Sequence, residues 1–236
     1  MPLASAAMSS LAGQHSIPVP DGEVPAYVSG PDDVSTLAGL VVIPSIFGPT
    51  DFLLAQIATL ADVGLTAVID PFWRQGGGPL PLSSRDEAFE RVGQLDRSAC
   101  GQDVEAVAQW VGERTNGRVV GLGICFGGPF ALTGATSGHF AGAVTWHGTR
   151  IEGVLDQLDG LTAPLRLHFG EADPITPPEV IDAVRQRFAD HPDCTIAIHP
   201  GAVHGYSHEG PAYDEAAAEA GLADLRNLIK ALGGQP

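Results

Sequence analysis

The sequence predicts an α/β fold with one mostly parallel sheet and helices on both faces of that sheet. Short runs rich in β-branched residues alternate with longer amphipathic runs along most of the chain, and the short runs contain few polar residues. Strands of this kind are buried on both faces, which is typical of parallel strands connected by covering helices. With 236 residues, 44% of them hydrophobic, the chain is expected to form a single domain over residues 1–236.

The first thirty residues predict a short antiparallel hairpin at the N-terminal edge of the sheet. Residues 16–19 and 24–28 have the character of strands, and residues 20–23 between them contain the proline, aspartate and glycine typical of a turn.

The remainder of the chain alternates between predicted strands and predicted helices. The strands are expected at residues 40–43, 65–69, 118–124, 142–146, 165–169 and 195–198, and the helices at residues 52–63, 101–114, from 127, 178–188 and 213–232. A segment rich in proline and glycine, residues 71–82, is long enough to form one wall of a cleft. Ligands bind beyond the carboxyl ends of strands in such sheets, so the residues that follow the strands are the candidates for a site.

Charge and cysteine usage exclude several classes of partner. The chain has 28 acidic and 12 basic residues, a formal net charge of −16, which repels phosphate backbones and anionic lipid surfaces. No apolar run approaches the roughly 18 residues of a membrane span, and the start of the chain lacks the pattern of a secretion signal. We therefore expect a cytoplasmic protein with neither nucleic acid nor membrane partners. The three cysteines have no paired spacing, so no disulfide framework is expected.

The strongest functional signal lies at Cys125, where a buried-strand pattern ends in Gly-Ile-Cys-Phe-Gly-Gly and a helix follows. Glycines two residues before and after the cysteine allow a sharp turn from strand to helix, the pattern of a nucleophile elbow with sulfur in place of a serine oxygen. The helix N-terminus favours the thiolate. Cys100, expected at a helix start, is a weaker candidate because no such turn presents it, and Cys194 is interpreted as a small apolar strand residue.

A base and an orienting acid for this thiol follow in the chain. Asp173 comes after the strand at 165–169 and His204 after the strand at 195–198, so both are expected at the same sheet edge as Cys125. A thiol nucleophile needs a base within hydrogen-bond reach, and the base needs an acceptor that fixes its tautomer. Taken alone, Asp173 is better explained as a turn residue and His204 as an exposed loop histidine. The order of the three favours a catalytic triad.

Eight histidines raise the question of a metal site. His199, His204 and His208 lie within ten residues, but the sequence contains neither a His-Glu-x-x-His helix nor a matched cysteine pair. We therefore expect no metal site and no cofactor. Four other histidines are interpreted as surface or packing residues: His139, His147, His168 and His191. Among them, His147 comes directly after a predicted strand and is the one that could face the cleft.

The motifs Gly-x-Cys125-x-Gly-Gly, Gly-Glu-x-Asp173 and Gly-x-x-His204, in this order and spacing, resemble the dienelactone hydrolase family, the carboxymethylenebutenolidases. The likeness extends to residues 44–48, 70–74 and 103–106. It implies an α/β-hydrolase that cleaves a lactone carrying a carboxylate without metal or cofactor, and it implies a monomer, with a homodimer left open.

The resemblance also implies roles for individual residues. Cys125 would be the nucleophile, His204 the base and Asp173 its orienting partner, and the backbone N–H groups of Ile46 and Phe126 would form the oxyanion hole.

Two positions depart from the family pattern. Ser45 occupies the position of a glutamate that exchanges a proton with the thiol, and His208 occupies that of an arginine that binds the substrate carboxylate. Arg74 matches the other arginine of that clamp. The lost charged contact is expected to weaken binding of carboxylate-bearing lactones by roughly 1 to 3 kcal/mol. Ser45, Phe72, Trp73, Arg74 and His208 are the candidates for substrate binding, although Phe72 and Trp73 are equally explained as core residues under their loop.

The sequence therefore favours a hydrolase that cleaves a lactone or an activated carboxylic ester through a thioacyl-enzyme intermediate. The two departures raise an alternative, a catalytically degenerate member of the family that acts as a small-molecule binding or regulatory protein, and the intact triad argues against it. A redox-sensing thiol is a third hypothesis, and the lack of a resolving cysteine nearby in the sequence argues against it.

Overall fold

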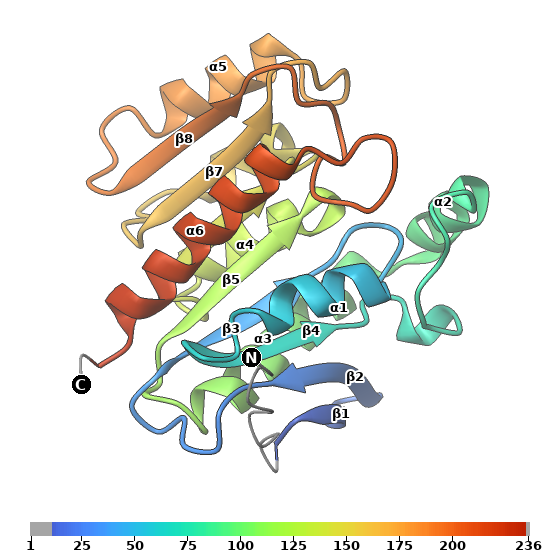
Figure 1. Cartoon of the computed structure of the whole chain (residues 1–236), viewed down its shortest axis with the longest axis vertical. Coiled ribbons are helices and arrows are strands. Elements are labelled where there is room, and N and C mark those ends of the chain that lie inside the picture. The colour runs from blue at the N-terminus through green and yellow to red at the C-terminus, as the bar shows by residue number, and fades with distance from the viewer. Residues whose placement is uncertain (1–10, 235–236) are drawn as a thin grey trace, which may run out of the picture.

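The computed structural model of the chain describes residues 11–234. These residues form an eight-stranded sheet in the order β1-β2-β4-β3-β5-β6-β7-β8 (Figure 1). Strands β3 to β8 pair in parallel, whereas the β1-β2 hairpin is antiparallel and joins the sheet through an antiparallel β2-β4 pair. The mostly parallel sheet and its N-terminal hairpin are confirmed. The strands are β1 (Gly13–Val19), β2 (Gly22–Ser29), β3 (Ala38–Ile43), β4 (Gly64–Ile69), β5 (Val119–Ile124), β6 (Gly142–Trp146), β7 (Leu165–Gly170) and β8 (Cys194–His199).

Helices cover both faces of this sheet. Figure 1 shows α1 and α6 on the near face and α3 and α4 on the opposite face, while α5 lies at the β8 end. The helices are α1 (Asp51–Ala58), α2 (Arg85–Gln94), α3 (Arg97–Gly112), α4 (Gly128–Thr136), α5 (Pro178–Arg187) and α6 (Glu215–Leu232), with short 3₁₀ turns η1 (Trp73–Gln75), η2 (Cys125–Gly127), η3 (Ile151–Gly153) and η4 (Leu155–Gln157). In the part of the chain that the structure describes, no helix combines the length and apolarity that crossing a bilayer requires.

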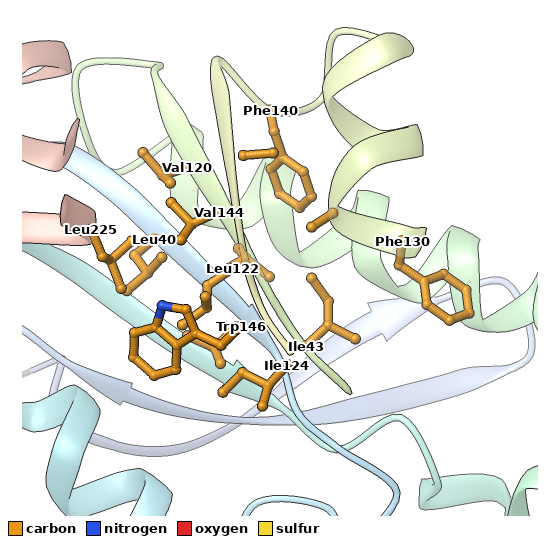
Figure 2. Close-up of a cluster of buried hydrophobic side chains, with 14 of the residues drawn as sticks. Leu40, Ile43, Val120, Leu122, Ile124, Phe130, Phe140, Val144, Trp146 and Leu225 are labelled. Carbon is orange, nitrogen blue, oxygen red and sulfur yellow. The ribbon is translucent and has the colours of Figure 1, made fainter. Parts of the chain in front are cut away.

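Two large aromatic side chains fill the two interfaces between sheet and helices. Trp146 of β6 packs against Gly221 of α6, where an added Cβ would lie 2.7 Å from the indole Nε1. Phe140 packs on the other face against Gly121 of β5, where a Cβ would lie 2.4 Å from the ring. Figure 2 shows Trp146 with Leu225 of α6 on one side of the strands and Phe140 on the other. Both sites admit an aromatic ring because the facing residue has no side chain.

Helix α2 and the starts of α3 and α6 differ from the sequence-based expectation. No helix was expected at residues 85–94, because the buried face of α2 consists only of Ala88 and Arg91, too little to give an apolar stripe. Helix α3 begins four residues earlier than expected, since the Asp96 carboxylate accepts the N–H groups of Ser98 and Ala99. Helix α6 begins at Glu215, after its capping residue Asp214, and not at residue 213 as expected.

Candidate active site

Cys125 lies at a sharp turn between β5 and α4, and the flanking glycines explain how the chain makes this turn. Its φ angle is 52°, in the left-handed region that L residues rarely adopt. A Cβ on Gly123 would lie 2.3 Å from the carbonyl oxygen of Gly127, and a Cβ on Gly127 would lie 2.1 Å from the carbonyl oxygen of Ile43. Side chains at these two positions would therefore overlap the backbone. The structure confirms the strand-turn-helix geometry predicted for Cys125.

The thiol of Cys125 begins a chain of two hydrogen bonds that joins three strand ends. The Nε2 atom of His204, which follows β8, lies 3.2 Å from Cys125 Sγ, and its Nδ1 atom lies 2.8 Å from Oδ2 of Asp173, which follows β7. The second carboxylate oxygen of Asp173 accepts the N–H of Ile175 at 2.8 Å, which fixes the carboxyl plane. The structure thus brings together the three residues that the sequence placed at one edge of the sheet.

These contacts make the imidazole of His204 more basic than usual. Burial lowers the pKa of its imidazole, but the hydrogen bonds to Asp173 and Cys125 outweigh burial and raise the pKa to about 9. A base with this pKa holds its proton at neutral pH when both partners are in place.

Among the described residues, the backbone N–H groups of Phe126 and Ile46 have no acceptor and are free to donate to a ligand. Phe126 is the second residue of η2, at a helix start where the first N–H groups have no intrahelical acceptor. Ile46 is the first inner residue of the turn closed by the N–H of Gly48 and the carbonyl of Ser45, at 3.0 Å. Neither the Phe126 nor the Ile46 N–H donates to an acceptor within residues 11–234.

His147 also belongs to this site, directly after β6. Its φ angle is 38°, its side chain is fully buried, and its ring lies edge-on to the ring of His204 with the centroids 4.9 Å apart. Its Nε2 contacts Ser207 Oγ at 2.8 Å, and its Nδ1 has no hydrogen-bond partner among the described residues. Burial lowers the pKa of His147 well below its ordinary value, so the ring is neutral. The sequence indicated only that His147 could face the cleft, and its position after a strand was the available signal.

A cavity of about 300 Å³ adjoins this site through His208, whose ring lies edge-on to the ring of His147 with the centroids 5.0 Å apart. Cys125, His147 and His204 are not among the residues that line it. Ser45 and His208 line it, together with Phe47 and the 79–82 segment, so the proline- and glycine-rich loop forms one wall as expected. Two carboxylates, Asp51 and Glu209, also line the cavity, and no lysine or arginine of the described residues does. Burial lowers the pKa of His208 to about 4, so its ring carries no charge at neutral pH. The cavity has negative groups and no cation.

The chain was compared with known protein families and with individual proteins. The profile of the dienelactone hydrolase family matches residues 24–233. The chain belongs to the dienelactone hydrolase family. It is 30% identical to a carboxymethylenebutenolidase of Rhodococcus opacus over 198 residues, 79% of this chain and 74% of that protein. It is 27% identical to a carboxymethylenebutenolidase of Pseudomonas putida over 196 residues, 80% of this chain and 83% of that protein.

Solved structures share the fold. A dienelactone hydrolase-like promiscuous phosphotriesterase from metagenomic libraries superposes with a TM-score of 0.74 at 22% identity, covering 95% of this chain and 100% of that one. The architecture is that of the α/β-hydrolases, as the resemblance implied. The chain is thus a dienelactone hydrolase-like hydrolase with a buried cysteine and two histidines at its candidate site.

Arg74, expected to bind substrate as in the dienelactone hydrolase pattern, is committed to other partners. Its guanidinium donates to both carboxylate oxygens of Asp21, at 2.8 and 2.6 Å, and to those of Asp103. The Asp103 carboxylate is fully buried and needs these donors, since an unpaired buried charge costs several kcal/mol. Trp73 Nε1 donates to the same carboxylate at 2.9 Å, while Phe72 is fully buried and packs on Phe126. None of these three expected substrate contacts lines the 300 Å³ cavity.

The structure also shows how the other reactive groups considered in the sequence are placed. Cys100 lies inside the first turn of α3 with no exposure, and burial and Asp103 raise the pKa of its thiol to about 12, so it is not a second nucleophile. Side chains that could bind a metal do lie close together, but they are not the His199, His204 and His208 that lie within ten residues in the sequence. One ligand atom each from Cys125, His147 and His204 lies within 4.8 Å of the others, whereas His199 contacts His168 instead.

Proposed function

We propose that the protein hydrolyses a lactone or carboxylic ester through a thioester formed on Cys125. The observation that carries this proposal is the hydrogen-bond chain from the Cys125 thiol at the elbow, through His204, to the buried carboxylate of Asp173. The two relatives named above are carboxymethylenebutenolidases, which supports a cyclic ester as one class of substrate.

In the acylation step, the Cys125 thiolate attacks the carbonyl carbon and the electron pair of the C=O bond moves to oxygen. We propose that the N–H groups of Phe126 and Ile46, which have no acceptor among the described residues, receive this oxyanion. As the C–O bond of the ester breaks, the proton on His204 passes to the departing oxygen, leaving a thioester and an alcohol that remains attached if the substrate was a lactone.

In the deacylation step, neutral His204 removes a proton from water, and the resulting hydroxide attacks the thioester carbonyl. Collapse of the tetrahedral intermediate expels the Cys125 thiolate and releases the acid, and His204 keeps the proton. The carboxylate of Asp173 stabilises the imidazolium in both steps and holds its Nδ1–H.

The cavity favours a substrate without a carboxylate. Asp51 and Glu209 repel an anion, His208 is neutral at the position of the family's arginine, and Arg74 is neutralised by two aspartates. We therefore propose an uncharged lactone or ester, with its apolar part between Phe47 and the 79–82 segment.

The test is a rapid-mixing experiment with uncharged aryl esters, combined with intact-mass measurement of protein quenched during turnover. We expect a burst of about one equivalent of phenol, a mass increase equal to the acyl group on Cys125, and a slower steady release of acid. Labelling of the thiol without continued release across a panel of lactones and esters would instead support the binding or regulatory alternative, and the proposal would be rejected.

Substrate charge is tested by comparing kcat/KM for an ester with a terminal carboxylate and for an uncharged ester of equal length. The uncharged ester is expected to be favoured by roughly tenfold or more, one charged contact being about 1.5 to 3 kcal/mol. Glu209→Gln should narrow this ratio, whereas Glu219→Gln, at an exposed position of α6, should leave it unchanged. A preference for the charged ester in the wild-type protein would refute this part of the proposal.

A further inference from the structure

Cys125, His147 and His204 together form a set of ligands that the hydrolytic steps do not fully use. Hydrolysis requires Cys125 and His204, but no step needs His147. Yet His147 is fully buried in a left-handed backbone conformation, with a ring nitrogen that has no partner among the described residues. A strained backbone and an unpaired buried nitrogen both cost free energy. Because His147 carries both and its ring lies against the ring of His204, we expect His147 to have a function.

The geometry suits a metal ion. One ligand atom from each of the three side chains lies within 4.8 Å of the others, and the pair formed by Cys125 Sγ and His204 Nε2 is 3.2 Å apart. Ligand atoms about 2.0 to 2.3 Å from a tetrahedral ion lie roughly 3.3 to 3.7 Å from one another, so shifts of about 1 Å suffice.

The chemistry of the ligands selects the ion. One thiolate and two imidazoles suit Zn²⁺ and neighbouring transition metals, whereas Mg²⁺ and Ca²⁺ require oxygen ligands. Three protein ligands leave the fourth tetrahedral position open.

The surrounding groups already orient the rings as metal ligands are oriented. Asp173 accepts the Nδ1–H of His204 at 2.8 Å, which leaves Nε2 directed at the sulfur, and a carboxylate behind a histidine in this way is usual at zinc sites. Ser207 Oγ, 2.8 Å from Nε2 of His147, steadies this ring, and Nδ1 has no partner among the described residues. The net charge of −16 attracts cations to the molecule as a whole.

We propose that Zn²⁺, or a transition-metal ion of similar softness, binds Cys125, His147 and His204 and reversibly inhibits the enzyme by occupying its nucleophile. On binding, the sulfur and one nitrogen of each ring donate lone pairs to the ion, and the proton shared by Cys125 and His204 is released to solvent. No bond to carbon forms and nothing is oxidised. Metal binding stands independently of the proposed function, and only the inhibition rests on that function.

The experiment uses the full chain without a histidine tag, freed of metal with a chelator. Zn²⁺ binding is measured by competition with a chromophoric chelator, and Co²⁺ is added separately as a spectroscopic probe. We expect one equivalent of Zn²⁺ bound, ester turnover lost in parallel and restored by the chelator, and a thiolate-to-Co²⁺ charge-transfer band with tetrahedral ligand-field bands.

Variants distinguish this site from adventitious binding. His147→Phe should weaken Zn²⁺ binding by at least the tenfold that loss of even an outer-shell partner produces, and Cys125→Ser should abolish the charge-transfer band. His139→Phe, at an exposed histidine of the described residues, is the matched control and should bind as the wild type does. His147→Gln, which keeps a polar group beside Ser207, serves if the phenylalanine variant does not fold.

Equal Zn²⁺ affinity in the wild type and in a folded His147 variant would overturn the proposal, as would Co²⁺ binding without a thiolate band or equal inhibition by Mg²⁺. Because the Co²⁺ spectrum needs no turnover, a protein that shows the band but hydrolyses no ester would refute the proposed function and leave the metal site standing.

Discussion

Cys125 and Cys100 are both buried thiols at the beginning of a helix, yet their surroundings differ completely. Cys125 sits at a left-handed turn with His204 Nε2 3.2 Å from its sulfur. Cys100 lies within the regular first turn of α3, beside the buried Asp103 carboxylate, and burial followed by this negative charge raises the pKa of its thiol to about 12. A helix N-terminus therefore does not by itself make a nucleophile.

The difference lies in where the contacts of each thiol come from. The Cys100 thiol is buried in the core, and the charged groups that act on it are Asp103 and Arg97 of its own helix and Arg74. The Cys125 thiol contacts His204, 79 positions further along the chain, and His204 contacts Asp173, which follows a third strand. Only the sheet edge, where parallel strands all end, brings such distant residues together.

The largest expected effect separates the two thiols directly. Cys125→Ala should lower ester turnover by about 10⁴-fold or more, because the acyl acceptor is removed. Cys100→Ala should leave turnover unchanged and reduce the free energy of unfolding by about 1 kcal/mol through lost apolar contact. Steady-state assays and urea unfolding measure both. Comparable turnover in the two variants would contradict the assignment of Cys125 as the nucleophile and Cys100 as a core residue.

The next largest effect is expected at Asp173, the carboxylate that contacts His204 and that has no counterpart at Cys100. Asp173→Asn should retain the positions of Cys125 and His204 but lower turnover by about 10² to 10⁴-fold, since the amide cannot stabilise the imidazolium or hold its tautomer. Aryl ester kinetics provide the measurement, with the exposed Asp182→Asn as the matched control. If the two variants turned over equally fast, Asp173 would have no role in orienting the base.

A third comparison concerns the glycine that follows each cysteine in the chain, Gly127 after Cys125 and Gly101 after Cys100. Gly127→Ala should reduce the free energy of unfolding by about 3 kcal/mol or more, since its Cβ would lie 2.1 Å from the Ile43 carbonyl oxygen. Gly101→Ala, next to Cys100 in α3, meets nothing within 4 Å and should stabilise the helix by about 0.5 to 1 kcal/mol. Equilibrium unfolding of the two variants is the check, and effects of the same sign would contradict the packing described for the elbow.

The last expected effect is the pH dependence of stability. The pKa of His204 is about 9 in the folded protein and near its ordinary 6.5 when unfolded, so the folded state binds the proton more tightly. Its stabilisation is complete below pH 6.5 and is lost as pH rises towards 9. Urea unfolding across this range should show the decline in the wild type and a shallower one in Asp173→Asn, and identical slopes would show that Asp173 does not raise this pKa.

Particular residues show how far the sequence could predict the site. The sequence could single out Cys125, Asp173 and His204, whose side chains meet in the structure, because each carries a local signal, either a glycine-framed turn or a position after a buried strand. Arg74 was expected to face the substrate, since its local pattern matches the family, but its partners Asp21 and Asp103 lie 53 and 29 residues away. His147 likewise gave no signal beyond its place after β6. Helix α2 was missed because Ala88 and Arg91 are its only buried residues.

The sequence by itself determined the alternation of strands and helices, the turn at Cys125 and the order of the three candidate catalytic residues, because these follow from local backbone preferences and hydrophobic periodicity. The tertiary structure decided which carboxylates neutralise Arg74, which histidine packs against the base, and the negative lining of the cavity. Those properties depend on distances between segments remote in the chain, and charge and burial act through such distances.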